Sequence, residues 1–137
     1  MTITSLSRTV FFLAIAAAIS FSFMSANPEQ KWKAPPEADK LKNPFEKDTE
    51  AWKKAESTFK NLCVICHGEK GKGDGIAGMA LTPRPANLTS EAVQKQTDGA
   101  IFWKITNGNP PMASYKETLT EEQRWLLVKY IRHLGTK

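Results

Sequence analysis

Apolar residues recur at helical spacing in the C-terminal half of the chain, most regularly in residues 120–134. Thr120 and Gln123 stand at the first and fourth positions of a capping box, in which each side chain accepts a hydrogen bond from the backbone of the other residue. The apolar positions that follow keep to one face of a helix with 3.6 residues per turn. They are Trp125, Leu127, Val128, Ile131 and Leu134. The pattern therefore predicts an amphipathic helix over residues 120–134.

A second helix is predicted over residues 97–108. It opens at Thr97 or Asp98 and stops at Gly108, because glycine commonly follows the last turn of a helix. Its expected buried face consists of Ile101, Phe102 and Ile105.

Two more helices are predicted earlier in the chain. One has Asp48 or Thr49 as its N-cap and runs directly into Cys63. The other is short, covers residues 90–96 and is capped by Ser90. No stretch has the alternating pattern of a strand, so the predicted fold class is all-α.

Residues 1–26 differ from the rest of the chain. Arg8 is the only charged residue among them, and residues 10–24 are almost purely apolar. A short positive region before such a run is typical of a secretory signal peptide. An uncleaved N-terminal anchor through residues 10–26 is the alternative, although a membrane-spanning helix needs about 20 apolar residues. On either interpretation we expect the remaining chain to be exported.

A proline- and charge-rich arm is predicted between this segment and the domain expected over residues 48–137. Residues 27–47 contain four prolines, many charges and little periodicity, so they indicate an extended arm or linker. Trp32 and Phe45 are the residues that could attach it to the domain.

The charge of the chain limits its partners. Lysine and arginine number 19 against 14 aspartates and glutamates, a net charge of +5. Only four of these cations are arginines, whereas surfaces that bind nucleic acid are rich in arginine. We therefore expect no nucleic acid partner, and a mildly basic face suits an acidic protein instead.

Both cysteines lie in one short motif, CVICH at residues 63–67. Three interpretations compete: a redox dithiol, part of a zinc or iron–sulfur site, and covalent haem attachment. A redox pair usually opens a helix in a βαβ unit, whereas this motif closes a helix. A zinc or iron–sulfur site needs about four ligands, and the only other histidine is the distant His133. A G-x-G-x-x-G pattern at residues 73–78 lacks the strand that dinucleotide binding requires, so it is interpreted as a glycine-rich loop.

Haem attachment uses all three residues of the motif. Cys63 and Cys66 can each add a thiol to one vinyl group of the porphyrin, and His67 can offer its imidazole to the iron. C-x-x-C-H is the signature of this attachment. The sequence therefore predicts one covalent haem c, with Cys63 and Cys66 as thioethers and His67 as an axial ligand.

The sixth position of the iron has three candidate ligands: Met79, Met112 and His133. Met79 lies only 12 residues after His67, which is close for a loop that must cross to the opposite haem face. His133 suits the end of a helix or the surface. Met112 follows two prolines that stiffen its loop, and His/Met ligation suits electron transfer. We predict Met112 as the second axial ligand, with an open sixth position as the alternative.

The ordered series of these segments resembles the class I monohaem c-type cytochromes. The resemblance covers residues 48–134 and leaves residues 27–47 outside. It includes the entry helix into CVICHGEKGKGDG, the loop PRPANLTS, the segment TDGAIFWKITNGNPPMASY and the last helix. It implies a small cytochrome c fold, in which three main helices surround one haem and the first and last helices cross. It also implies His67 and Met112 as axial ligands and a one-electron carrier rather than an enzyme.

The predicted function is electron transfer between respiratory redox partners in the periplasm, free or anchored to the membrane. Lys60, Lys70 and Lys72 flank the CVICH motif and form a candidate docking face for an acidic partner. Two alternatives stay open. The chain could be a haem-bearing subunit of a larger membrane redox complex, or an open-site haem enzyme or sensor if Met112 does not bind iron.

Overall fold

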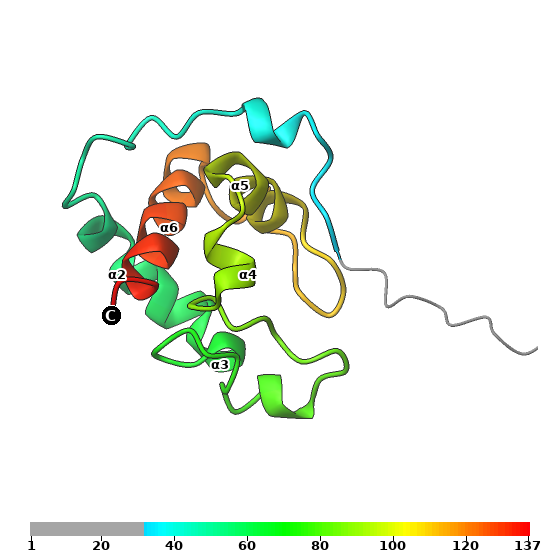
Figure 1. The fold of residues 1–137 in the computed structure, drawn as a ribbon. Coiled ribbons are helices and arrows are strands. Elements are labelled where there is room, and N and C mark those ends of the chain that lie inside the picture. The colour runs from blue at the N-terminus through cyan, green and yellow to red at the C-terminus, as the bar shows by residue number, and fades with distance from the viewer. Residues whose placement is uncertain (1–31) are drawn as a thin grey trace, which may run out of the picture. The chain divides into compact units, whose positions relative to one another are not determined.

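Two helices from distant parts of the sequence, α2 (Trp52–Leu62) and α6 (Glu121–Leu134), pack against each other. The computed structural model describes residues 32–137 (Figure 1). Phe59 of α2 is buried, and its ring centre lies 4.7 Å from that of Tyr130 on α6. This helix pair forms one side of the hydrophobic core.

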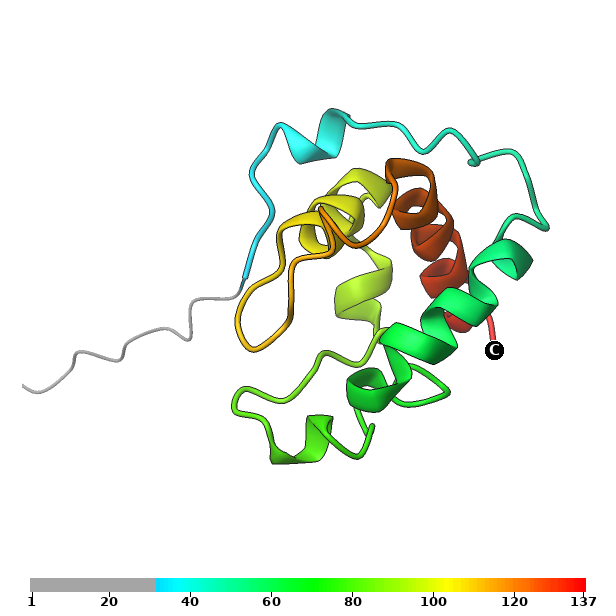
Figure 2. The same cartoon turned by 180° about the vertical axis from the view of Figure 1, so that it is seen from behind.

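The third main helix, α5 (Asp98–Asn107), packs against α6 and completes the core (Figure 2). Phe102 stacks on Trp125 of α6, with ring centres 3.9 Å apart. Ile101 and Ile105 are buried beside Phe102, so the predicted buried face of this helix is confirmed.

Four short elements accompany the main helices in residues 32–137. They are the helices α3 (Val64–His67) and α4 (Glu91–Gln94) and the 3₁₀ turns η2 (Ala38–Lys40) and η3 (Gly78–Ala80). Residues 32–137 contain no β-strand, only an isolated bridge between Asn109 and Met112. The predicted all-α fold class is confirmed for this part of the chain. No helix in the same residues is both long enough and apolar enough to cross a membrane.

The helix starts predicted from capping residues are confirmed for α5 and α6. Thr120 Oγ1 accepts a hydrogen bond from the Gln123 backbone at 3.2 Å, and Gln123 Oε1 accepts one from the Thr120 backbone at 2.9 Å. Thr97 Oγ1 accepts a hydrogen bond from the Ala100 backbone at 3.0 Å. Gly108 ends α5 with a φ of 66°, a left-handed conformation that glycine adopts without strain.

The predicted N-cap of the first helix is wrong, and that of the short helix is confirmed only in position. The N-cap of α2 is Ala51 rather than Asp48 or Thr49. Asp48 Oδ1 instead accepts a hydrogen bond from the Glu50 backbone, which forms a local turn before the helix. Ser90 does stand at the N-cap of α4, but its hydroxyl donates to the Asn87 carbonyl oxygen and caps no helical N–H.

The described part of the arm lies against α5. The carbonyl oxygen of Ala38, in η2, is so close to Gly99 that a β-carbon on Gly99 would lie 1.9 Å from it. Only glycine permits this approach. Trp32 also contacts α5, since its ring centre lies 6.5 Å from that of Trp103.

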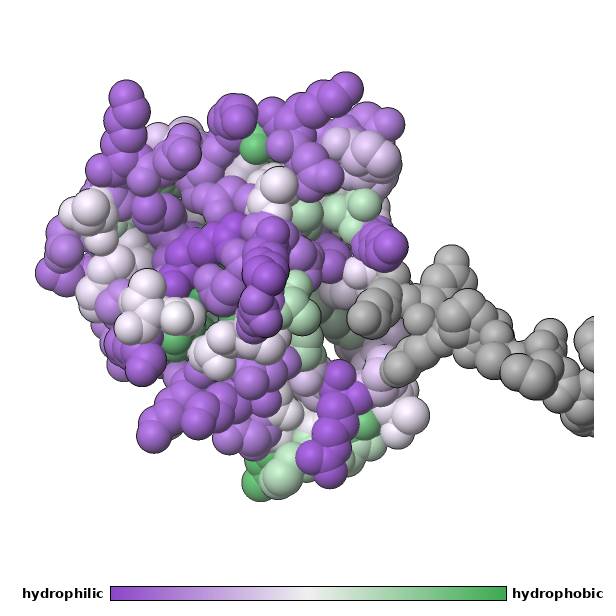
Figure 3. All heavy atoms as spheres, viewed as in Figure 1, coloured by the Kyte–Doolittle hydropathy of each residue, from purple (hydrophilic) through white to green (hydrophobic). Residues whose placement is uncertain are grey.

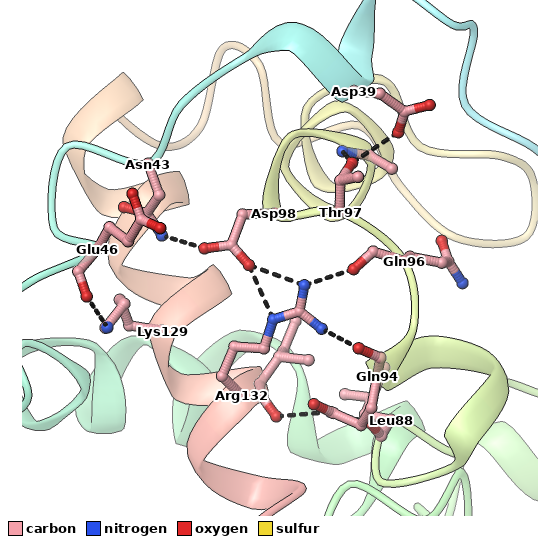
Figure 4. Close-up of polar contacts among 12 residues, drawn as sticks. Asp39, Asn43, Glu46, Leu88, Gln94, Gln96, Thr97, Asp98, Lys129 and Arg132 are labelled. Atoms are coloured by element: carbon pink, nitrogen blue, oxygen red, sulfur yellow. Dashed lines mark hydrogen bonds and ion pairs between the residues drawn. The ribbon is translucent and has the colours of Figure 1, made fainter.

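A network of polar contacts joins the arm to α5 and α6 (Figure 4). Asn43 is buried and donates to Asp98 Oδ2 at 2.9 Å, while Arg132 of α6 donates to Asp98 Oδ1 at 2.8 Å. Thr97 donates to Asp39 Oδ1 at 2.6 Å, and Lys129 donates to the Glu46 carbonyl oxygen at 3.0 Å. The arm is thus held at several points along its length.

The predicted signal peptide or anchor, residues 1–26, lies outside the described residues. So do residues 27–31, the first part of the predicted arm.

Candidate functional site

The CVICH motif occupies the junction between α2 and α3. Helix α2 ends at Leu62, Cys63 forms the joint, and α3 runs from Val64 to His67. The Cys63 carbonyl oxygen accepts hydrogen bonds from the backbone of Cys66 at 3.2 Å and of His67 at 2.8 Å. Positions three and four residues apart share one face of a helical turn. The two thiols and the imidazole therefore lie on the same side of this turn.

His67 is oriented by a backbone carbonyl from another segment. Its Nδ1 lies 3.2 Å from the Ala86 carbonyl oxygen. Because a carbonyl can only accept, Nδ1 carries the proton and donates, and the lone pair of the neutral ring lies on Nε2. Burial lowers the pKa of His67, which favours this neutral form.

The two cysteines are unpaired and partly buried. Burial, and to a smaller extent the neighbouring Cys66, raise the pKa of Cys63 to about 12. The Cys63 side chain is therefore a neutral thiol at neutral pH.

The glycine-rich loop after the motif folds back onto α3. Backbone N–H groups of Gly73, Gly75 and Ala77 donate to the carbonyl oxygens of His67, Cys66 and Ile65 at 2.8, 3.1 and 2.9 Å. A β-carbon on Gly75 would lie 2.4 Å from the Val64 carbonyl oxygen. In this loop the glycines serve close backbone packing around α3.

Met112 lies in the loop between α5 and α6 and is half-buried. Its backbone exchanges two hydrogen bonds with Asn109, at 2.8 and 3.0 Å, so residues 109–112 form a tight turn. Three residues later, the Tyr115 hydroxyl donates to the Leu62 carbonyl oxygen at 3.2 Å. That contact brings the loop to the end of α2 where the cysteines begin.

The raised pKa of Tyr115 agrees with a position close to the two cysteines. Burial, and then the nearby thiols of Cys63 and Cys66, raise the pKa of Tyr115. The Tyr115 hydroxyl therefore stays protonated at neutral pH and remains a donor.

The two other candidates for the sixth ligand lie elsewhere. The His133 ring stacks on Trp52, at the beginning of α2, with ring centres 3.7 Å apart. A helix rises 1.5 Å per residue, so Cys63 at the other end of α2 is about 16 Å away. Met79 lies on η3, beside α3, and its side chain is 52% exposed.

The site residues fit a haem c better than a metal cage. Within the described chain, no three His, Cys, Asp or Glu side chains gather as they would around a metal ion. Cys63 and its chain neighbours Leu62 and Val64, together with Tyr115, pack against the core but are only partly buried. Apolar side chains beside two thiols and an oriented imidazole suit a flat, largely apolar porphyrin.

A comparison with protein families identifies the domain. Residues 50–131 match the family described as cytochrome c oxidase, cbb3-type, subunit III. The chain belongs to this family of c-type cytochrome domains. The resemblance to monohaem c-type cytochromes and the all-α cytochrome c fold are thereby confirmed. None of the curated proteins compared with the chain is significantly similar to it.

Two contacts at this cytochrome site were not predicted from the sequence. The acceptor for His67 is the main-chain oxygen of Ala86. Every residue has such an oxygen, so the residue type gives no indication of this contact. For Tyr115, the available signal in the sequence was a tyrosine three residues after the predicted ligand Met112.

Proposed function

We propose that Cys63 and Cys66 hold one haem c by thioether bonds and that His67 and Met112 are its axial ligands. The observation that carries this proposal is the hydrogen bond from His67 Nδ1 to the Ala86 carbonyl oxygen, at 3.2 Å. This bond fixes the ring and leaves Nε2 to bind iron, as is usual for histidines that ligate metals. The position of both cysteines on the same turn supports it.

The proposed activity is one-electron transfer. Haem c bound at this site would supply a couple between ferric and ferrous iron. The thioether of Met112 would raise the reduction potential, and the hydrogen bond that His67 donates to the Ala86 carbonyl oxygen would tune the basicity of the ring. Leu62 and Val64 would shield the group from water. These roles describe an electron carrier and require no catalytic side chain.

We propose that the protein works outside the cytoplasm, in the periplasm, between respiratory redox proteins. Residues 1–26 would direct its export as a signal peptide or hold it at the membrane as a short anchor. Residues 27–47 would join this segment to the haem domain of residues 48–137.

The proposed docking face for redox proteins surrounds α3. Lys60, Lys70 and Lys72 are exposed there. Figure 3 shows hydrophobic residues gathered at the lower end of the face in view, where η3 lies in Figure 1. The exposed apolar residues of this region are Ile65 at 52%, Ile76 at 75% and Met79 at 52%. A partner with acidic groups around an apolar centre would match this surface.

A second candidate role is a subunit of a larger membrane redox complex. It is favoured by the name of the matching family, which describes a subunit of an oxidase. Purification from the native membrane distinguishes the two roles. A carrier separates as a small protein in buffer without detergent, whereas a subunit elutes with larger haem-containing partners.

The ligand assignment is tested by the optical spectrum of the matured protein. Ferric haem with His/Met ligation has a weak far-red band that reports the iron–sulfur bond. We expect this band in the wild type and in Met79→Ala, and we expect its loss in Met112→Ala. Met79→Ala is the matched control, because it removes the other candidate methionine, which lies on η3 beside α3.

Three results would contradict the proposal. A band that survives in Met112→Ala would exclude Met112 as the ligand. A high-spin wild type without the band would leave the sixth position open and favour the enzyme or sensor alternative. If no haem is bound, the interpretation of Cys63, Cys66 and His67 is wrong.

A further inference from the structure

Tyr115 uses all three of its polar groups to join separate segments. Its hydroxyl donates to the Leu62 carbonyl oxygen at 3.2 Å, and its backbone N–H donates to the Ile105 carbonyl oxygen at 3.1 Å. Its own carbonyl oxygen accepts a hydrogen bond from the Leu119 backbone at 3.0 Å. One residue thus connects the end of α2, the last part of α5 and the chain leading into α6.

The Tyr115 hydroxyl contacts the C-terminal end of α2. The last carbonyl groups of a helix have no partner within it and must find donors elsewhere. Leu62 is the final residue of α2, and the next residue is Cys63. Tyr115 therefore caps the helix at the residue before the haem attachment motif.

Neighbouring contacts hold the same loop from other sides. Ser114 donates to the Thr106 carbonyl oxygen in α5 at 2.7 Å. Arg124 of α6, which is only 8% exposed, donates to the Lys116 carbonyl oxygen at 3.2 Å. These contacts tie the loop to α5 and α6. Of this set, only the Tyr115 hydroxyl reaches α2.

We propose that Tyr115 is a positioning residue, whose hydroxyl ties the Met112 loop to the cysteine end of α2 and so keeps the Met112 sulfur on the iron. This role rests on the proposed ligation by Met112. A loop of this kind opens transiently, and each opening lets the sulfur leave. The hydrogen bond to Leu62 opposes opening, because an open loop leaves that carbonyl oxygen without its partner.

Tyr115→Phe removes only the oxygen and keeps the ring that contacts the core. A matched control is Tyr130→Phe, because Tyr130 is buried and its hydroxyl makes no hydrogen bond within residues 32–137. Both variants are compared with the wild type as full-length, haem-loaded ferric proteins.

The measurement is a titration with imidazole, followed by the loss of the far-red iron–sulfur band. Imidazole binds iron only when the methionine has left, so its apparent affinity reports how readily the loop opens. We expect Tyr115→Phe to bind imidazole about three- to tenfold more tightly than the wild type, as loss of one hydrogen bond predicts. Tyr130→Phe should stay within about twofold.

Thermal unfolding, followed by the helical circular dichroism signal, separates positioning from general destabilisation. If Tyr115 only stabilised the fold, the two tyrosine variants would show imidazole affinities that follow their melting temperatures. An imidazole affinity of Tyr115→Phe within twofold of the wild type would overturn the proposal. A wild type without the far-red band would overturn ligation by Met112 and this role together, so the two failures are distinguishable.

Discussion

The His133 ring lies flat against Trp52, with ring centres 3.7 Å apart and planes inclined by 4°. Its Nε2 is buried and has no hydrogen-bond partner among residues 32–137. Protonation would place a charged N–H in this position without an acceptor, which is unfavourable. Burial, followed by the nearby charge of Lys137, accordingly lowers the pKa of His133, while Glu50 and Glu56 oppose this effect.

We expect His133 to make the domain less stable in mild acid. Because its pKa is lower in the folded protein than in the unfolded chain, the unfolded chain binds the proton more readily. The stabilising contribution is therefore complete above the ordinary value of about 6.5 and is lost as the pH falls through the lower folded pKa. The free energy of unfolding of the haem-loaded protein, measured by denaturant titration between pH 7 and pH 5, should fall accordingly.

His133→Phe provides the comparison, because phenylalanine can stack on Trp52 but does not titrate. The variant should lose less stability than the wild type over this pH range. Carboxylates titrate in both proteins, so the difference between the two slopes isolates His133. Identical slopes would show that His133 has the same pKa in the folded and unfolded states.

Among the elements, the arm is held by a small number of contacts that can be removed singly. Asn43 is 6% exposed, donates to Asp98 and accepts a hydrogen bond from the Phe45 backbone at 2.9 Å. Asn43→Ala leaves both partners without it, which costs about 1–3 kcal/mol. We expect the melting temperature to fall by roughly 4–8 °C per kcal/mol for a domain of this size. Thermal unfolding followed by circular dichroism gives the value.

The control for the arm is Lys42→Ala, an exposed neighbour whose removal should change the melting temperature by less than the error of the measurement. Both variants should keep the far-red band, because Asn43 contacts α5 and its neighbours in the arm rather than the α2–α3 junction. Equal melting temperatures for Asn43→Ala and the wild type would mean that the arm adds little to the stability of the domain.

The sequence alone was sufficient to predict the elements whose ends are determined by neighbouring residues. The cap residues of α5 and α6 and the spacing of CVICH depend on residues within a few positions of each other. The start of α2 was mispredicted because Asp48 forms a turn with the Glu50 backbone. Trp32 and Phe45 were predicted to attach the arm, and Trp32 does contact α5 while Phe45 packs against the core. The hydrogen bond between Asn43 and Asp98 could not be predicted, since these residues lie 55 positions apart in sequence. The acceptor for His67 could not be predicted for another reason: it is a backbone oxygen, which every residue has.

In the described domain as a whole, the residues around the CVICH motif pack directly against the hydrophobic core. The buried cluster draws on α2, α5 and α6, and Leu62, Cys63, Val64 and Tyr115 pack against it while only partly buried. A domain of about this size buries a modest fraction of its surface, so a bound group can decide whether it is stable. We therefore expect the double variant Cys63→Ala/Cys66→Ala, which lacks both proposed haem-attachment thiols, to lose its cooperative thermal transition.

The single variant Cys63→Ala is the matched control, because it retains one of the two proposed attachment cysteines and the same His67. It should bind haem and unfold cooperatively at a lower temperature than the wild type. If coupling between haem and folding is the cause, the order of stability is wild type, single variant, double variant. A haem-free double variant that melts cooperatively at the wild-type temperature would show that the helices α2, α5 and α6 form a sufficient core by themselves. The stability of the fold would then not depend on the bound haem.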